Sequence, residues 1–138
     1  MTDRVDRQTR SAMMASVRSK NSRPELLVRS LVHRLGYRYR LHASDLPGSP
    51  DIVFRAKRKV IFVHGCFWHR HKGCPKTTMP ESRTEFWKTK FEANVLRDLR
   101  VEQALKDAKW SVVTIWQCEI KDAEQLAKRL ERFLRDPS

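Results

Sequence analysis

Apolar side chains recur at helical spacing in three segments of the chain. The first segment begins at Ser22-Arg23-Pro24-Glu25, where serine suits an N-cap, proline fits the first turn and glutamate follows three residues after the serine. Leu27, Leu31 and Leu35 then follow at steps of four residues, and Gly36 ends the pattern. The sequence therefore predicts an amphipathic helix between this serine and this glycine.

Two further helices are predicted in the second half of the chain. Ser82-Arg83-Thr84-Glu85 has the pattern of a capping box, and an apolar stripe follows it to about Ala108. Asp122 is the predicted N-cap of the last helix. The two stripes consist of Trp87, Phe91, Val95 and Leu99 in the long helix, and of Leu126, Leu130, Phe133 and Leu134 in the last one.

Segments rich in β-branched and aromatic residues alternate with these helices and predict strands. Three of them, residues 37–41, 51–54 and 59–64, precede the long helix, and residues 110–116 follow it. Residues 65–80 show no periodic pattern and hold Gly, Pro, Cys and His instead. With a short helix in the first 20 residues, the order is α-α-β-β-β-loop-α-β-α. It predicts an α/β fold, a mixed central sheet flanked by helices, in a single domain of residues 1–138.

A strong positive charge adds a candidate partner to this picture. The 138 residues carry a net charge of +13, with a sequence pI of about 10.3. Ten basic and three acidic side chains lie in residues 1–40, which places +7 of that charge there. This density favours nucleic-acid binding over a merely solubilising surface, and residues 1–20 form a basic arm expected to contact DNA. No signal peptide or apolar run of membrane-spanning length occurs, so the expected compartment is the cytoplasm.

Three cysteines and a histidine predict a metal site in the irregular segment. Cys66, His71 and Cys74 lie within nine residues, and Cys118 follows the last predicted strand. Four thiolate and imidazole ligands are typical of a closed, structural zinc site. The spacing does not decide whether His71, His69 or His64 is the fourth ligand. The alternative interpretation is three unrelated buried cysteines and a surface histidine.

The residues around the second and third predicted strands suggest a nuclease centre. Asp51 opens one strand after Pro50, and His64 ends the next. A carboxylate so placed is typical of a Mg²⁺ site that also uses substrate phosphate oxygens. His64 and His69 are not both needed for zinc, so one of them is a candidate to move a proton near the scissile phosphate. Asp98 is a candidate orienting partner, although a surface ion pair on its basic helix explains it equally.

Two other features allow more than one interpretation. Glu25 is a candidate acid, but the capping pattern at Ser22 already accounts for it. Phe67 and Trp68 stand beside His69 and suit a wedge between base pairs. From the residues alone, core packing over the metal loop is the favoured interpretation of these two aromatics.

The string His64-Gly65-Cys66-Phe67-Trp68-His69 resembles the very short patch repair endonucleases. Thr84-Glu85-Phe86-Trp87, Asn94, Arg97-Asp98, Thr9-Arg10-Ser11 and the turn from Leu46 to Asp51 also match that family. The resemblance extends from about Thr9 to Trp116. It implies a fold like that of type II restriction enzymes, the PD-(D/E)XK type, with a structural zinc site beside the nuclease centre.

The resemblance also implies a reaction, namely Mg²⁺-dependent nicking of double-stranded DNA on the 5′ side of the thymine in a T·G mismatch. Such mismatches arise by deamination of 5-methylcytosine. The chain would act as a monomer, with mismatch-repair proteins as candidate partners. Two alternatives stay open: a zinc-stabilised DNA-binding protein without catalysis, and a restriction-type nuclease that acts on matched DNA.

Carried over residue by residue, the family's roles cover most of the candidates above. Asp51 and the backbone carbonyl of Val63, where the best-known member has threonine, would bind Mg²⁺. His69 would be the general base, oriented by Asp98, while His64 would assist at the phosphate and Glu25 would lie near the active centre. The zinc ligands would be Cys66, His71, Cys74 and Cys118, and the DNA-contacting residues would be Met14, Phe67, Trp68 and Trp87.

Overall fold

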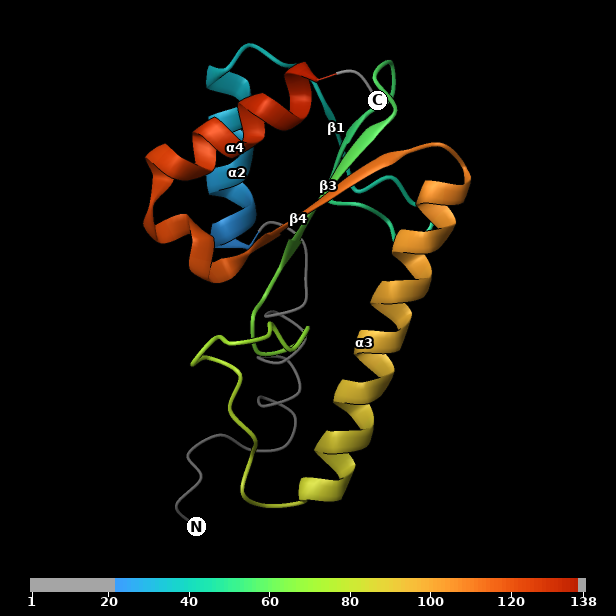
Figure 1. Cartoon of the computed structure of the whole chain (residues 1–138), viewed down its shortest axis with the longest axis vertical. Coiled ribbons are helices and arrows are strands. Elements are labelled where there is room, and N and C mark those ends of the chain that lie inside the picture. The colour runs from blue at the N-terminus through green and yellow to red at the C-terminus, as the bar shows by residue number, and fades with distance from the viewer. Residues whose placement is uncertain (1–21, 137–138) are drawn as a thin grey trace.

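A four-stranded mixed sheet forms the centre of the computed structural model, which describes residues 22–136 (Figure 1). The strands β1 (Arg40–Leu41), β2 (Ile52–Phe54), β3 (Lys59–His64) and β4 (Ser111–Trp116) lie side by side in chain order. The first three pair antiparallel, and β4 pairs parallel to β3, with His64 opposite Trp116. The predicted mixed sheet with flanking helices is confirmed. The predicted arm of residues 1–20, with Met14, lies outside the described residues.

Helices cover both faces of this sheet. Helices α2 (Arg23–Arg34) and α4 (Ala123–Arg135) pack together on one side, and α3 (Thr84–Asp107) runs along the other (Figure 1). Successive side chains of a strand point to opposite faces. Ile61 accordingly packs with α2 and α4, whereas its neighbours Val60 and Phe62 pack with Leu105 of α3. The two predicted amphipathic helices at the ends of the described chain thus share one core.

Local capping explains where two of the helices begin. The Ser22 hydroxyl accepts a hydrogen bond from the backbone N–H of Glu25, and the Asp122 carboxylate accepts one from the N–H of Gln125. Both predicted N-caps are confirmed. The predicted capping box of α3 is wrong: the N-cap is Arg83, which has a left-handed backbone (φ 55°) and makes no side-chain cap. The Thr84 hydroxyl instead donates to backbone carbonyls of the preceding turn.

The long helix shows a second departure from the sequence pattern. Phe91 is buried, but Leu99 is 60% exposed, and Leu105 takes its place in the core. Four residues in a helix of 3.6 residues per turn advance about 40° beyond a full turn, so a stripe at steps of four rotates away from the sheet. The buried face therefore continues to Leu105 through positions other than those of the predicted stripe.

The strands are also shorter or more open than predicted. Only Arg40 and Leu41 of the segment 37–41 pair in the sheet, while Tyr37 and Tyr39 pack edge-on against Phe54. Most of β4 is half-buried, because one of its faces lines the cleft described below. Residues 65–80 form turns without helix or strand, as predicted. None of the helices within residues 22–136 has the length and apolar character needed to span a membrane.

Candidate active site and metal-binding cluster

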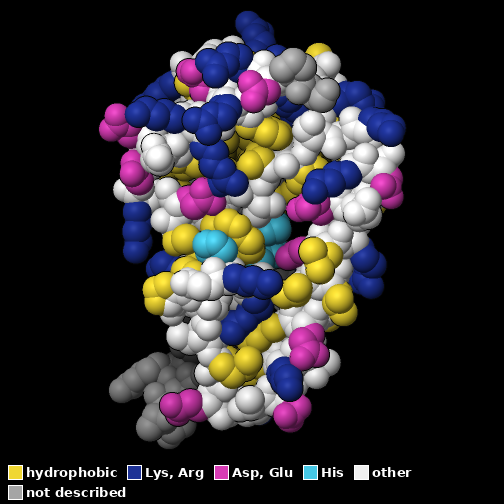
Figure 2. Space-filling view, viewed as in Figure 1, with side chains coloured by type: hydrophobic (Ala, Val, Ile, Leu, Met, Phe, Trp, Pro, Cys, Tyr) yellow, Lys and Arg dark blue, Asp and Glu magenta, His cyan; other side chains and the backbone are white. Residues whose placement is uncertain are grey.

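The predicted catalytic side chains meet in one cleft between the sheet and α3. The cleft has a volume of about 950 Å³. Figure 2 shows histidine side chains gathered in a hollow near the middle of one face, with Lys and Arg close by. The lining includes all five predicted catalytic residues, from α2, β3, α3 and the loops that flank the strands: Glu25, Asp51, His64, His69 and Asp98.

His69 and Asp98 form a hydrogen-bonded pair inside this cleft. Nδ1 of His69 lies 2.6 Å from the Asp98 carboxylate, and each side chain is 24% exposed. The pair is a contact between the irregular loop and α3. One helical turn earlier, the buried Asn94 amide donates to the Trp68 carbonyl, which fixes the backbone just before His69. The structure therefore places the Asp98 carboxylate against Nδ1 of His69, and the orienting role of Asp98 stays a prediction.

The second histidine is held differently. The His64 ring stacks on the His69 ring, with centroids 3.8 Å apart and an interplanar angle of 7°. Burial lowers the pKa of His64 to about 3, and the positive charge of His69 acts in the same direction. His64 is therefore a neutral imidazole in the chain without DNA.

Asp51 lies beside a second acidic residue, Glu25, in the same cleft. Its carboxylate accepts a hydrogen bond of 2.7 Å from the backbone N–H of Val63 in β3. Burial raises the pKa of Asp51 to about 6, the Val63 N–H opposes that rise, and the negative charge of Glu25 adds to it. Two carboxylates brought this close in a partly buried place favour a bound cation, and oxygen donors of this kind suit a hard ion.

Glu25 is held by two hydrogen-bond partners, Arg29 and His42, that are not among the predicted site residues. It is only 2% exposed and accepts hydrogen bonds from Arg29, four residues along α2, and from Nε2 of His42 at 2.7 Å. Arg29 was detectable from its i, i+4 spacing. His42 comes from the end of β1 with a left-handed backbone (φ 47°), and no local pattern points to it.

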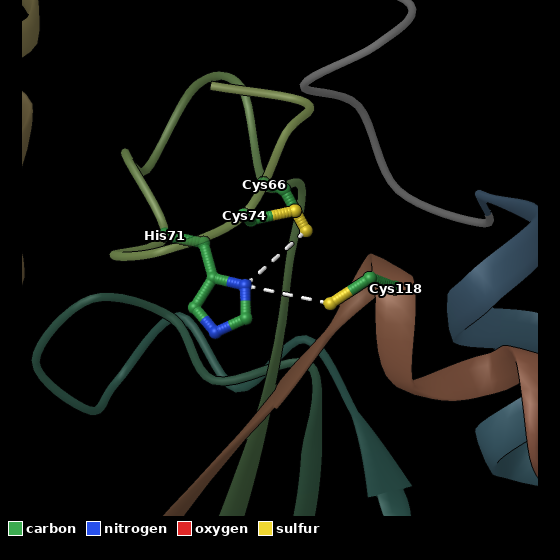
Figure 3. Close-up of side chains that lie close together, drawn as sticks. All are labelled: Cys66, His71, Cys74 and Cys118. Atoms are coloured by element: carbon green, nitrogen blue, oxygen red, sulfur yellow. Dashed lines mark hydrogen bonds between the residues drawn. The ribbon is translucent and has the colours of Figure 1, made fainter.

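The three cysteines and His71 form a separate cluster at the same end of the sheet. Their donor atoms all lie within 4.8 Å of one another, and Figure 3 shows His71 facing the sulfur atoms. Nδ1 of His71 lies 3.6 Å from the Cys66 sulfur and 3.4 Å from the Cys118 sulfur. Cys118 belongs to the 3-10 helix η1 (Gln117–Lys121), directly after β4. The fold thus groups His71 with the cysteines, whereas His64 and His69 lie together with Asp98.

The thiols of this cluster differ in acidity. Burial raises the pKa of the Cys66 thiol to about 12. The pKa of Cys74 is lowered, because its sulfur accepts a hydrogen bond from the backbone N–H of Lys76. A metal ion held here would displace the thiol protons. The arrangement is a candidate metal-binding cluster with four donors supplied by the chain.

The predicted DNA-contacting aromatics pack against one another in the free chain. Trp68 is 6% exposed and lies against Trp87 and Phe91 of α3, with ring centroids 5.9 and 6.2 Å away. Phe67 meets Trp68 and Phe91 edge-on. The core-packing interpretation thus describes Trp68 in the chain without DNA, and its predicted contact with DNA stays a prediction.

Comparisons with known proteins agree with these observations. A model of the family "DNA mismatch endonuclease Vsr" matches residues 2–76. The type II nicking enzyme V.XorIIP of Xanthomonas oryzae pv. oryzae is 54% identical over 138 residues, which cover 100% of both chains. The type II nicking enzyme V.NmeAIP of Neisseria meningitidis is 38% identical over 136 residues, covering 99% of this chain and 96% of the relative. The DNA mismatch endonuclease Vsr of Escherichia coli is 37% identical over 139 residues, covering 97% and 88%.

These relatives are endonucleases, and the α/β chain with a histidine- and carboxylate-lined cleft is an endonuclease as well. It belongs to the DNA mismatch endonuclease Vsr family. The resemblance that rested on the string from His64 to His69 is thereby confirmed.

Proposed function

We propose that this endonuclease nicks double-stranded DNA on the 5′ side of the thymine in a T·G mismatch, and that it requires Mg²⁺. The mismatch is the product of 5-methylcytosine deamination, so the nick would start very short patch repair. One observation carries the proposal: Asp51 and the His69–Asp98 pair line the same cleft. The name of the Escherichia coli relative supports the mismatch, and the names of the other two support cutting of one strand.

In this proposal His69 takes the proton from the attacking water. Asp98 accepts the Nδ1–H of His69 and so leaves Nε2 as the basic atom. His64 contacts the scissile phosphate from its place against the His69 ring. Glu25, held by Arg29 and His42, supplies a fixed acid beside Asp51.

The oxygen donors around Asp51 fit a magnesium ion. The Asp51 carboxylate and the backbone carbonyl of Val63 would hold it, so the valine side chain at position 63 does not interfere. Bound Mg²⁺ would stabilise the charge that develops on the phosphate and help to place the water. The raised pKa of Asp51 supports this assignment, because a cation offsets the cost of a buried carboxylate.

The donor set of the cysteine cluster fits zinc. Two ligands of a tetrahedral zinc ion, one sulfur and one imidazole nitrogen, are about 3.6 Å apart. The sulfurs of Cys66 and Cys118 lie 3.6 and 3.4 Å from Nδ1 of His71. With Cys74 the coordination is complete, so the site would be structural and would fix the loop of residues 65–80 to η1.

The remaining features describe how the enzyme would hold DNA. We infer a restriction-enzyme-like domain of residues 1–138 that works as a monomer in the cytoplasm. Phe67 and Trp68 would enter the DNA at the mismatch from the major groove, and Met14 on the arm would oppose them from the minor groove. Trp87 would lie near the DNA. Because Trp68 is buried in the free chain, its insertion requires the aromatic cluster on α3 to open.

The test is strand-resolved nicking of end-labelled duplexes with Mg²⁺, in which a T·G duplex is compared with the matched C·G duplex. We expect a nick only in the thymine strand and only in the mismatched duplex. Equal cutting of both duplexes would replace the proposal with a restriction-type nuclease. Binding without cutting would leave a DNA-binding module in place of the enzyme.

A further inference from the structure

A continuous series of ring contacts connects the cysteine cluster to the catalytic histidines. The His71 ring stacks on the Trp116 indole, with centroids 4.2 Å apart and an interplanar angle of 8°. The same indole meets the His64 ring edge-on at 5.4 Å, and His64 stacks on His69. Trp116 is therefore the one ring of the series that touches both a cysteine-cluster residue and a cleft histidine.

The backbone places Trp116 at this junction. It is the last residue of β4 and the register partner of His64, the last residue of β3. Its backbone N–H donates to the Glu119 carboxylate at the start of η1, and Cys118 follows two residues later. The sheet and the residues of the cysteine cluster therefore both hold Trp116 in place.

The contacts of the His64 side chain within the described part of the chain are contacts between rings. Among residues 22–136 its imidazole has no hydrogen-bond partner, in contrast to His69, which Asp98 holds. Its ring is surrounded by those of Phe62 at 5.5 Å, Trp116 and His69. The direction in which its nitrogens point is therefore set by ring packing.

We propose that Trp116 is a positioning residue. Its indole, held by the His71 ring of the cysteine cluster, fixes the orientation of the His64 imidazole. A change of about 1 Å in the position of a catalytic group lowers a rate by up to roughly 10²-fold. The inference rests on the proposed function in one respect, which is that His64 contacts the scissile phosphate. It assigns to Trp116 an effect on the chemical step that acts through His64 and not through DNA affinity.

The matched control is the tryptophan that immediately precedes this strand. Trp110 stands just before β4 at its opposite end, is 8% exposed, and packs in the core between α3 and the sheet. Replacing Trp110 by leucine makes the same change of side chain next to the opposite end of β4, away from the cysteine cluster and the cleft histidines. Trp116→Leu and Trp110→Leu therefore separate loss of positioning from loss of core packing.

The experiment measures single-turnover nicking of the T·G duplex by zinc-loaded chains, together with duplex affinity and zinc content. For Trp116→Leu we expect a nicking rate about 10- to 100-fold lower, with duplex affinity unchanged within about threefold. Trp116→Phe, which keeps a flat ring, should recover most of the rate, and Trp110→Leu should keep it. In a His64→Ala background, Trp116→Leu should cause little further loss of rate, because both changes remove the same contribution of His64 to the reaction.

A readout without DNA keeps the inference separate from the proposed function. Nuclear Overhauser contacts between the His64 and His69 rings should be present in the wild type and in Trp110→Leu, and lost in Trp116→Leu. If the wild type cuts the T·G duplex and Trp116→Leu keeps both the ring contacts and the nicking rate, the role of Trp116 is overturned and the proposed function stands. A full additional loss in the His64→Ala background would also overturn it. A wild type that cuts no mismatched duplex would overturn the function, and the ring contacts would still decide the positioning. If Trp116→Leu does not fold, Trp116→Met takes its place with the same expectations.

Discussion

The two groups of ligating side chains at the end of the sheet differ in what completes them. The cysteine cluster brings four donors together from the loop and η1 within 4.8 Å. The cleft residues, among them Asp51, Glu25 and the His69–Asp98 pair, line an open volume of about 950 Å³. The chain thus supplies every donor of the first group, whereas the second leaves room for a substrate. In the proposed function the first group maintains shape and the second performs chemistry.

The largest expected effect is a loss of cutting when the Asp51 carboxylate in the cleft is replaced. Asp51→Asn should lower the nicking rate of the T·G duplex by about 10³-fold or more, because it removes the charged ligand of the proposed Mg²⁺ site. Duplex affinity should stay close to that of the wild type. The control is Asp45→Asn. Asp45 lies six residues before Asp51, and its exposed carboxylate pairs with Arg55. Cutting by Asp51→Asn at the rate of the Asp45→Asn control would refute the assignment.

A change in the cysteine cluster should affect stability as well as cutting. Cys118→Ser should lower the free energy of unfolding by about 3 kcal/mol or more, because binding of a structural metal contributes directly to folding. Zinc content and thermal unfolding midpoint measure this, and nicking should fall in parallel. Retention of one zinc per chain with an unchanged midpoint would show that Cys118 is not a ligand.

The orienting carboxylate on α3 should have a smaller effect, confined to the rate. Asp98→Asn should lower the nicking rate by about 10²-fold, because it replaces the charged acceptor of the His69 Nδ1–H by a neutral amide. Thermal unfolding should change little. Asp107→Asn, an exposed change at the end of the same helix, is the control, and an equal loss of rate in both variants would contradict the role of Asp98.

The smallest expected effect is a pH-dependent gain of stability at Asp51. Its folded-state pKa is raised to about 6, so folding disfavours the charged carboxylate. The penalty is absent below the unfolded pKa of about 4, grows as pH rises towards 6, and is constant above it. Asp51→Asn should therefore raise the free energy of unfolding by about 2–3 kcal/mol at pH 7.5 and by less at pH 4.5, without Mg²⁺. Equal gains in urea unfolding at the two pH values would exclude this cause.

Local sequence signals predicted the parts of the molecule that are fixed by near neighbours. Ser22 and Asp122 cap their helices as predicted, and the spacing of Cys66, His71 and Cys74 predicted one cluster. Asp98 was a candidate partner of His69, but only the fold brings the loop to α3. The left-handed cap at Arg83 had no signal, because non-glycine residues seldom adopt it.

Residues that act across strands were the ones missed. His42 reaches Glu25 from the end of β1, 17 residues along the chain. Trp116 meets His64 only because β4 pairs parallel to β3 after the long helix. Both depend on strand register, which an isolated stretch of sequence does not specify.

The most direct test of the two-group account is the nicking rate of the T·G duplex as a function of added Mg²⁺, after brief EDTA treatment, with zinc measured in the same sample. The account predicts no cutting without Mg²⁺, full recovery when Mg²⁺ alone is added, and one zinc per chain throughout. Cutting that returns only with added zinc, or that persists without Mg²⁺, would contradict the division between a closed structural group and an open catalytic one.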